Sequence, residues 1–250
     1  MPSASRTIVS EVPTALLLPG LLCDQAVWAG QIPLLSARVR CLVPEYGEID
    51  SLPEMAQATL RLAPERFILV GHSMGGRVAL EIMRTAGPRV TALALLDTGY
   101  QARAQGPPGE QEAQARHSLV QLAESGGMRA MGRVWVQDMV PPERLTDASL
   151  IESILKMVER RTKLVLAAQI RALLARPQAA DVLPAIRCPT LLMCGRQDTW
   201  SPLARHATMQ RLIHGSHLEV IEDCGHMAPL ERPAEVADRL VRWISRCALR

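Results

Sequence analysis

The chain has 250 residues, of which 48% are hydrophobic and 21% are charged, close to the averages of folded globular proteins. This composition excludes a disordered or fibrous protein, and the length suffices for one large α/β domain with a sizeable core. With 28 basic and 25 acidic side chains the net charge is only +3, which argues against nucleic-acid binding through bulk charge. The basic residues are nearly all arginines, spread along the chain and interleaved with acids. We interpret them as a compositional habit rather than as a phosphate-binding patch.

The cysteines and the start of the chain lead us to expect a cytoplasmic protein. No CxxC pair occurs and no His and Cys residues have zinc spacing, so we expect reduced thiols and no metal or other cofactor. Cys23 and Cys224 lie near motifs described below, where we expect them to pack rather than react. The first twenty residues hold one arginine and an apolar run broken by Pro19, which makes a poor signal peptide. No apolar run approaches the roughly eighteen residues of a membrane span.

Short apolar runs alternate along the chain with segments of helical length. The runs are rich in Val, Ile and Leu and apolar on both faces, as in strands buried on both sides of a parallel sheet; they are Thr14–Leu18, Val39–Val43, Phe67–Val70, Val90–Leu96, Pro189–Cys194 and His217–Ile221. Between them we predict helices over Asp24–Leu35, Pro53–Ala63, Gly75–Ala86, Pro202–Ile213 and Pro233–Ile244. This rhythm predicts an α/β fold with a doubly wound, mostly parallel sheet flanked by helices.

One stretch breaks the alternation. From about Tyr100 to Leu183 no strand is expected, and apolar residues at three- and four-residue spacing predict helices over Glu110–Glu124, Gly127–Val140, Thr146–Arg160 and Lys163–Arg176. Because ligands of open α/β sheets bind beyond the carboxyl ends of the strands, we expect residues 100–183 to form a helical cap. Residues 1–99 and 184–250 would then form the core, although the helices could also pack as extra layers only.

The most informative motif is Gly71-His72-Ser73-Met74-Gly75, which follows a predicted strand and precedes a predicted helix. In the strand–G-x-S-x-G–helix arrangement, the two glycines allow a sharp, strained turn that exposes the serine hydroxyl at the strand tip. The amino end of the following helix favours negative charge developing there. We therefore predict that Ser73 is a nucleophile.

A serine hydroxyl needs a base to act as a nucleophile. His226 lies in Asp223-Cys224-Gly225-His226, on a loop that follows the last predicted strand. Of the six histidines it alone combines a glycine-preceded loop with the carboxyl edge of the sheet, and we predict that it is the base. The carboxylate that orients the imidazole is expected to be Asp198, after the preceding strand, with Asp97 as the rival.

An acyl-transfer site also needs donors aimed at the oxyanion. We expect one from the backbone N–H of Met74, directly after the nucleophile, and another from the loop after the first strand. In that loop Gly20 permits a tight turn and Leu21 would present its N–H, with Leu22 as the alternative. Trp28 and Trp200 are candidate residues at the border of the pocket, although Trp28 could equally be a packing residue.

These motifs together resemble the α/β-hydrolase superfamily, in its compact, capped, bacterial esterase-like branch. The resemblance covers nearly the whole chain apart from the cap: Pro19-Gly20-Leu21, the GHSMGG turn, Gly195–Asp198 and the GHMAPLERP stretch. The order Ser73, Asp198, His226 agrees with that of the family. Pro19-Gly20 replaces the usual His-Gly before the oxyanion residue, and the leading β-hairpin of the family is expected to be shortened or absent.

The resemblance implies a serine hydrolase without a cofactor, acting on a small or medium carboxylic ester or lactone through an acyl-enzyme. A serine at the centre of the G-x-S-x-G turn argues against haloalkane dehalogenases and epoxide hydrolases, which carry aspartate at that position. Two alternatives stay open. The same residues could serve carbon–carbon bond hydrolysis, acyl transfer or perhydrolysis, or the chain could be a ligand-binding signalling protein on the hydrolase fold. We expect a small-molecule partner, and neither nucleic acid nor membrane.

Overall fold

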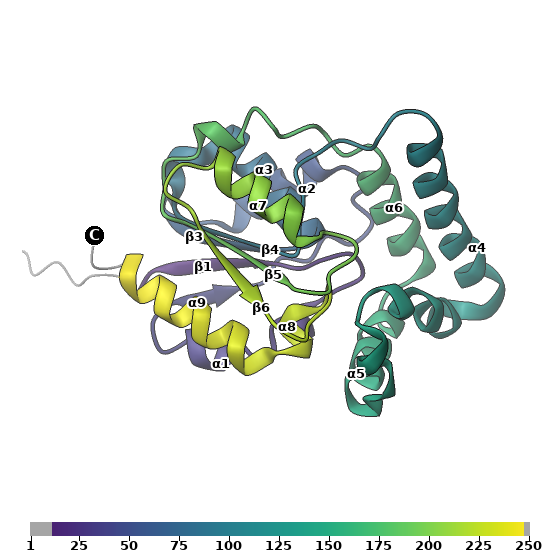
Figure 1. The fold of residues 1–250 in the computed structure, drawn as a ribbon. Helices are drawn as coiled ribbons and strands as arrows, with labels where there is room; N and C mark the ends of the chain where they lie inside the picture. Colours follow the sequence, from purple (N-terminus) through teal and green to yellow (C-terminus); the bar gives the residue numbers. More distant parts are fainter. Residues whose placement is uncertain (1–11, 248–250) are drawn as a thin grey trace, which may run out of the picture.

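A six-stranded, fully parallel sheet runs through the part of the chain that the computed structural model describes, residues 12–247 (Figure 1). Its strands follow one another in the order β2-β1-β3-β4-β5-β6. They are β1 (Thr14–Leu18), β2 (Arg40–Leu42), β3 (Phe67–His72), β4 (Val90–Leu96), β5 (Thr190–Gly195) and β6 (His217–Ile221). The chain order turns back at β1, so the first strands extend the sheet one way and the later strands the other, as the doubly wound prediction requires.

The strands form where the sequence concentrates Leu, Val and Ile, because only such runs can be buried on both faces of a sheet. β1, β3 and β5 are buried along their whole length, and Leu17, Val70 and Leu93 are completely inaccessible to solvent. The predicted strands are confirmed within one or two residues at each end. β2 is shorter than predicted and only half-buried, as expected of an edge strand.

Helices cover both faces of the sheet (Figure 1). α2 (Leu52–Leu62), α3 (Met74–Ala86) and α7 (Leu203–Leu212) lie on one face, and α1 (Ile32–Leu35) and α9 (Pro233–Cys247) on the other, with the short α8 (Ala228–Glu231) leading into α9. The apolar stripe of α9 shows why it packs there: its buried residues Val236, Leu240 and Trp243 recur at helical spacing. The predicted α/β fold class is confirmed.

The single helix predicted over Asp24–Leu35 is wrong. The segment forms a 3₁₀ turn over Gln25–Trp28 and one short α-helix, α1. Pro33 lacks the N–H that a continuous helix would need at that position. The Gln31 side chain instead donates to the carbonyls of Pro229 and Pro233, each at 3.0 Å, so tertiary contacts fix the break.

A helical insertion lies between β4 and β5. It consists of α4 (Pro107–Trp135), α5 (Ala148–Glu159) and α6 (Lys163–Leu174), with 3₁₀ turns between them. Two of the predicted helices are joined in α4, where Gly127, with φ +83° and ψ 168°, marks the expected break. In Figure 1 the insertion stands beyond the carboxyl ends of the strands, away from the C-terminus of the chain.

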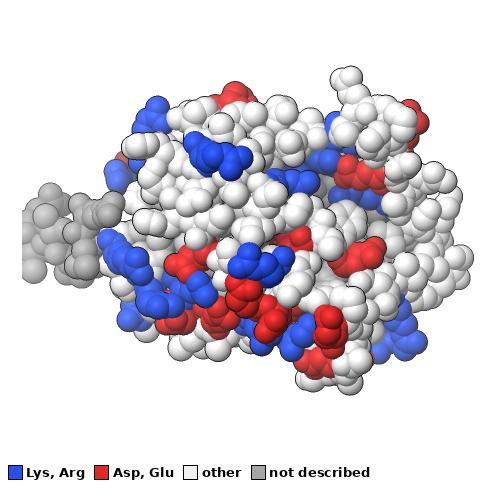
Figure 2. Space-filling model, in the orientation of Figure 1, with Lys and Arg blue, Asp and Glu red and all other residues white. Residues whose placement is uncertain are grey.

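The surface and the ends of the chain bear on the remaining expectations. On the face shown in Figure 2 basic and acidic side chains are interleaved rather than gathered into one basic patch. Within residues 12–247 no helix has the length and apolar character needed to span a bilayer. The expectation of a poor signal peptide, and that of a shortened leading hairpin, fall largely on residues 1–11, outside the described residues.

Candidate active site

Ser73 occupies a strained turn between β3 and α3. Its backbone has φ +54° and ψ −117°, a conformation that residues other than glycine rarely adopt. The turn is possible because Gly71 and Gly75 have no side chains: a Cβ on Gly71 would lie 2.6 Å from the Gly75 carbonyl oxygen, and one on Gly75 would overlap the Leu18 carbonyl. Thr98 secures the turn by donating its hydroxyl to the Ser73 carbonyl at 2.7 Å.

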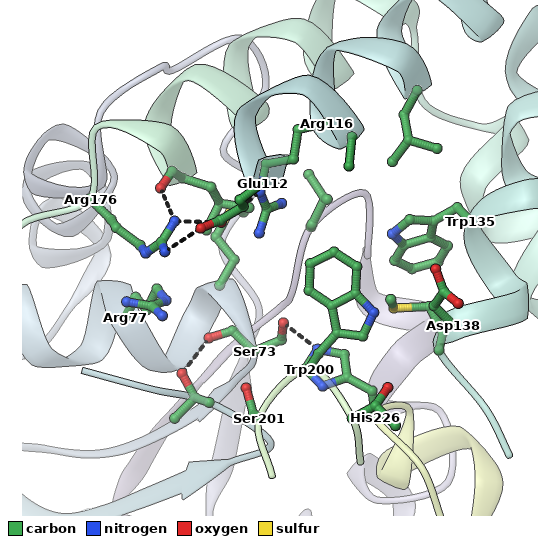
Figure 3. A pocket seen from close by; sticks show the side chains of 18 of the residues that line it. Ser73, Arg77, Glu112, Arg116, Trp135, Asp138, Arg176, Trp200, Ser201 and His226 are labelled. Atoms are coloured by element: carbon green, nitrogen blue, oxygen red, sulfur yellow. Dashed lines mark hydrogen bonds and ion pairs between the residues drawn. The ribbon is translucent and has the colours of Figure 1, made fainter. Parts of the chain in front are cut away.

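The structure brings Ser73, His226 and Asp198 into one hydrogen-bonded chain. The Ser73 hydroxyl lies 2.7 Å from His226 Nε2, and His226 Nδ1 lies 2.9 Å from Asp198 Oδ2. These contacts join β3 to the loops after β6 and β5, and all three side chains are at the carboxyl edge of the sheet (Figure 3 shows the Ser73–His226 contact). A proton on Nδ1 directed at Asp198 leaves the Nε2 lone pair facing the Ser73 hydroxyl.

Asp198 is buried but fully engaged. Its second oxygen accepts the backbone N–H groups of Trp200 and Ser201, each at 2.8 Å. Burial alone would raise the pKa of Asp198, but the charge and hydrogen bond of His226, together with the Ser201 N–H, outweigh it and hold this pKa below its ordinary value. Asp198 is therefore a carboxylate, able to stabilise a positive imidazole.

Asp97, the rival acid, lies next to this chain without joining it. Its Oδ1 accepts the Gly195 N–H at 2.9 Å, and its Oδ2 is 3.8 Å from His72 Nε2 rather than at His226. Burial first, and then the nearby charge of Asp198, raise the pKa of Asp97 well above its ordinary value. It is Asp198, and not Asp97, that contacts His226.

The His226 loop is held from both sides by a residue that the sequence reasoning missed. The buried carboxylate of Glu231 accepts the N–H groups of Gly225 and Met227, each at 3.0 Å, directly before and after His226. The His226 N–H donates to the Met139 carbonyl of the insertion at 2.8 Å. Glu231 stands in the GHMAPLERP stretch that carried the resemblance, so its proximity in sequence was the available signal.

The loop after β1 lies beside Ser73 and leaves the Leu21 N–H free. Gly20 lets it come close, because a Cβ there would lie 3.2 Å from Ser73 Cβ. Among residues 12–247 the N–H groups of Leu21 and Met74 have no hydrogen-bond partner. The Leu22 N–H, by contrast, donates to Gln169 Oε1 on α6 at 2.8 Å.

Three side chains of the insertion hold this loop. Besides Gln169, Arg160 pairs with both carboxylate oxygens of Asp24 at 2.7 and 3.0 Å, and Arg161 donates to the Cys23 carbonyl at 2.9 Å. Leu22 itself has a φ of +60°, which is strained for a leucine and needs such support. The insertion is therefore fastened to the loop next to Ser73 as well as to the His226 loop.

A cavity of about 550 Å³ opens above Ser73 and His226, between the sheet edge and the insertion (Figure 3). Leu21, Met74 and Trp200 also line it. Trp28 does not: it is fully buried and packs edge-on against His72, with ring centroids 6.3 Å apart, so it belongs to the core.

Cys23 and Cys224 are buried near the site. Burial raises the pKa of Cys23 to about 12, and that of Cys224 above its ordinary value. A protonated thiol is a poor nucleophile, which agrees with the expectation that both residues pack.

Known proteins resemble this chain over most of its length. The model of the alpha/beta hydrolase family matches residues 15–239. The chain belongs to this family. It is a hydrolase, and the resemblance drawn from its motifs is confirmed.

Named relatives and solved structures cover several kinds of hydrolase. The pimeloyl-[acyl-carrier protein] methyl ester esterase of Nitrosomonas europaea is 24% identical, over 89% of this chain and 92% of the relative. A 2-hydroxy-6-oxononadienedioate/2-hydroxy-6-oxononatrienedioate hydrolase of Klebsiella pneumoniae is 25% identical, over 86% and 79%. The structure of a thermophilic esterase from Thermogutta terrifontis superposes with a TM-score of 0.84 at 25% identity, covering 94% of this chain and 90% of that one.

Proposed function

We propose that this hydrolase cleaves a small or medium carboxylic ester or lactone through an acyl-enzyme formed on Ser73. The observation that carries the proposal is the hydrogen-bonded chain from the Ser73 hydroxyl through His226 to Asp198, at 2.7 and 2.9 Å, which opens into a cavity large enough for a small ester. In this proposal residues 100–183 act as a cap over a core of residues 1–99 and 184–250.

In the first half-reaction the Ser73 oxygen forms a bond to the substrate carbonyl carbon while its proton passes to His226 Nε2. Asp198 stabilises the imidazolium that results. The carbonyl electrons move onto the oxygen, which takes two hydrogen bonds from the unpartnered N–H groups of Leu21 and Met74. When the carbonyl re-forms, the bond to the leaving oxygen breaks, and that oxygen takes the proton from His226.

The second half-reaction repeats these steps with water. His226 takes a proton from the water molecule as its oxygen attacks the acyl carbon, and the bond to Ser73 then breaks. The Ser73 oxygen recovers the proton, and a carboxylic acid leaves. A lactone gives one hydroxy acid, because its acyl and alcohol parts are joined.

The choice between Leu21 and Leu22 as the second oxyanion donor follows from hydrogen-bond satisfaction. The Leu22 N–H is already engaged by Gln169, whereas the Leu21 N–H is without a partner among the described residues. An N–H that is unpaired beside a nucleophile is available to a developing oxyanion, and one such donor lowers the activation barrier by about 3–4 kcal/mol. Leu21 is therefore the donor in this proposal.

The test is a panel of esters and lactones of increasing acyl length, assayed with wild type and Ser73→Ala. We expect Ser73→Ala to lose at least about 10⁴-fold in kcat/KM and all labelling by a fluorophosphonate. Ser153→Ala, which removes an exposed serine of α5, is the matched control and should behave as wild type. Undiminished labelling of Ser73→Ala would remove Ser73 as the nucleophile.

The panel also includes a dienoic 1,5-diketone, because one relative is named as a 2-hydroxy-6-oxononadienedioate hydrolase. Cleavage of that diketone, with esters and lactones untouched, would assign carbon–carbon bond hydrolysis instead. A ligand that stays bound and is turned over only once would favour the alternative of a ligand-binding signalling protein on the hydrolase fold.

A further inference from the structure

The cavity above Ser73 carries more positive than negative charge. Its lining includes two acids, Glu112 and Asp138, and four arginines, Arg77, Arg116, Arg176 and Arg205. The arginines come from α3, α4, the segment after α6, and α7. Figure 3 shows Arg77 and Arg176 to one side of Ser73, whereas Asp138 lies on the opposite side. The excess positive charge is therefore local to one wall of the cavity.

Glu112 neutralises only part of this wall. Its two oxygens accept hydrogen bonds from both terminal nitrogens of Arg176, at 2.6 and 2.7 Å, and from Nε of Arg116 at 3.0 Å. The Arg116 guanidinium also lies over the Trp200 ring, 5.2 Å from its centroid. Within the described residues Glu112 forms ion pairs with Arg176 and Arg116 only, and its charge acts on Arg77 and Arg205 at longer range.

Of the four arginines that line the cavity, Arg77 and Arg205 are the two that form no ion pair in the described chain, although the charges of Asp198 and Glu112 act on Arg205. Among residues 12–247 neither forms an ion pair with a carboxylate. Arg77 donates to the Gln101 carbonyl at 2.9 Å and Arg205 to the Trp200 carbonyl at 2.7 Å. Each guanidinium has five N–H donors, and a single neutral carbonyl satisfies few of them.

The two guanidinium groups meet at Gly99. A Cβ on Gly99 would lie 3.2 Å from a terminal nitrogen of Arg77 and 3.3 Å from one of Arg205, and 2.8 Å from Arg205 Cδ. The missing side chain makes room for both. Burial, and then the charges of Arg176, Arg205 and Arg116, lower the pKa of Arg77 to about 9, which reflects the cost of gathering like charges in a partly dry wall.

We propose that Arg77 and Arg205 form an anion subsite beside Gly99 that binds a carboxylate carried by the substrate. The inference rests on the proposed function, since it names the substrate class of the same cavity: an ester or lactone with a free carboxylate on its acyl part. A planar guanidinium pairs with a carboxylate through two parallel hydrogen bonds, and two adjacent guanidinium groups that form no ion pair supply the charge that such a group needs.

The test compares esters that differ only in this charge. 4-Nitrophenyl hemiesters of succinate, glutarate and adipate are each paired with the neutral 4-nitrophenyl ester of the same acyl length. We expect the wild type to favour the anionic member of at least one pair by about 10- to 100-fold in kcat/KM, the effect of one charge-assisted contact. Because the preference is electrostatic, it should fall as salt is raised.

Variants of the two arginines assign the preference to the subsite. Arg77→Gln and Arg205→Gln should each bring the ratio of anionic to neutral ester toward one. The ratio within each pair, rather than the absolute rate, is the readout, because both residues line the cavity. Arg77→Lys should keep part of the ratio, since it retains the charge but not the fork. Arg133→Gln, which removes an exposed arginine of α4 outside the cavity, is the matched control and should keep the full ratio.

Inhibition of the neutral ester by free anions gives a second measurement that needs no variant. Glutarate should compete with the neutral ester, and its inhibition should be lost in Arg77→Gln. Inhibition by inorganic phosphate but not by glutarate would overturn the assignment to a carboxylate.

Equal rates for both members of every pair, in an enzyme that hydrolyses neutral esters through Ser73, would overturn the subsite and leave the proposed function standing. A preference retained in both glutamine variants would also overturn it. If no ester or lactone is cleaved in a Ser73-dependent way, it is the proposed function that fails.

Discussion

The side chain of Gln169 on α6 accepts the backbone N–H of Leu22 at 2.8 Å, across 147 positions of the sequence. Both residues are buried, and Leu22 has the left-handed φ of +60°. The contact therefore fixes the residue next to Leu21, whose free N–H is the proposed oxyanion donor. It also makes the insertion a structural support of the site.

Gln169→Leu tests this support. The substitution keeps the size of the side chain but leaves the buried Leu22 N–H without an acceptor, which costs about 1–3 kcal/mol in the free energy of unfolding. We expect the strained loop to relax and kcat for an ester to fall by about 10- to 100-fold, with KM less affected, because the Leu21 N–H contacts the oxyanion only after attack.

Urea denaturation and steady-state kinetics measure the two effects separately. Gln114→Leu, which changes an exposed glutamine of α4, is the control and should alter neither quantity. A Gln169→Leu enzyme that loses stability while its kcat stays at the wild-type value would show that the contact serves folding alone.

The features of the fold that could be predicted from the sequence are those that depend on neighbouring residues in the chain. Runs such as Phe67–Val70 predict buried strands because few other structures accommodate them, and the glycines around Ser73 predict a turn because only they fit it. Where a local pattern competes with tertiary contacts it misleads: the helical spacing of Asp24–Leu35 is overruled by Pro33 and by the bonds of Gln31.

The sequence could not predict the contacts that hold the loops of the site, nor the positive charge of the cavity wall. Gln169 and Leu22 meet only because the insertion folds back over the sheet edge, and no spacing rule connects them. The arginines looked scattered because their positions lie far apart in the chain, yet the fold brings Arg77, Arg116, Arg176 and Arg205 to one cavity. The interpretation of all the arginines as a habit of composition does not explain why these four lie together in the wall of the cavity.

The separate environments of Asp198 and Asp97 lead to a contrast between two variants. Asp198→Asn keeps the shape but removes the charge that stabilises the imidazolium and fixes the tautomer of His226, so we expect kcat to fall by about 10⁴-fold. Asp97→Asn keeps an oxygen for the Gly195 N–H and does not touch His226, and we expect less than a tenfold loss. Ester kinetics of both variants, with circular dichroism to check folding, measure the contrast. Equal losses would mean that Asp97 shares the work assigned to Asp198.

Two buried histidines make the stability of the fold depend on pH. Burial lowers the pKa of His72 from 6.5 to about 3 and that of His206 from 6.5 to about 4. His206 Nε2 accepts the Thr98 N–H at 3.2 Å. A proton on that nitrogen would replace this hydrogen bond by a repulsive contact between two N–H groups. His72 Nε2 donates to the His226 carbonyl at 2.8 Å, and its Nδ1 is buried without a partner that could accept a second proton. With their lowered pKa values both rings are neutral in the folded protein at pH 7.

Between these lowered values and 6.5 the unfolded chain binds protons that the folded chain does not. The two rings therefore make the free energy of unfolding fall as the pH drops below about 6.5, with a slope that approaches about 1.4 kcal/mol per pH unit for each histidine. Burial raises the pKa values of Asp97 and Glu231, which act in the opposite direction, so the contribution of one ring is the difference between wild type and its variant. Urea denaturation at stepped pH measures the slope. His206→Gln should reduce it by about one proton's worth, whereas Gln210→Ala, at an exposed and non-titrating position of the same helix α7, should leave it unchanged. A slope that His206→Gln does not alter would mean that this ring does not resist protonation in the folded state, and that the Thr98 contact does not hold it neutral.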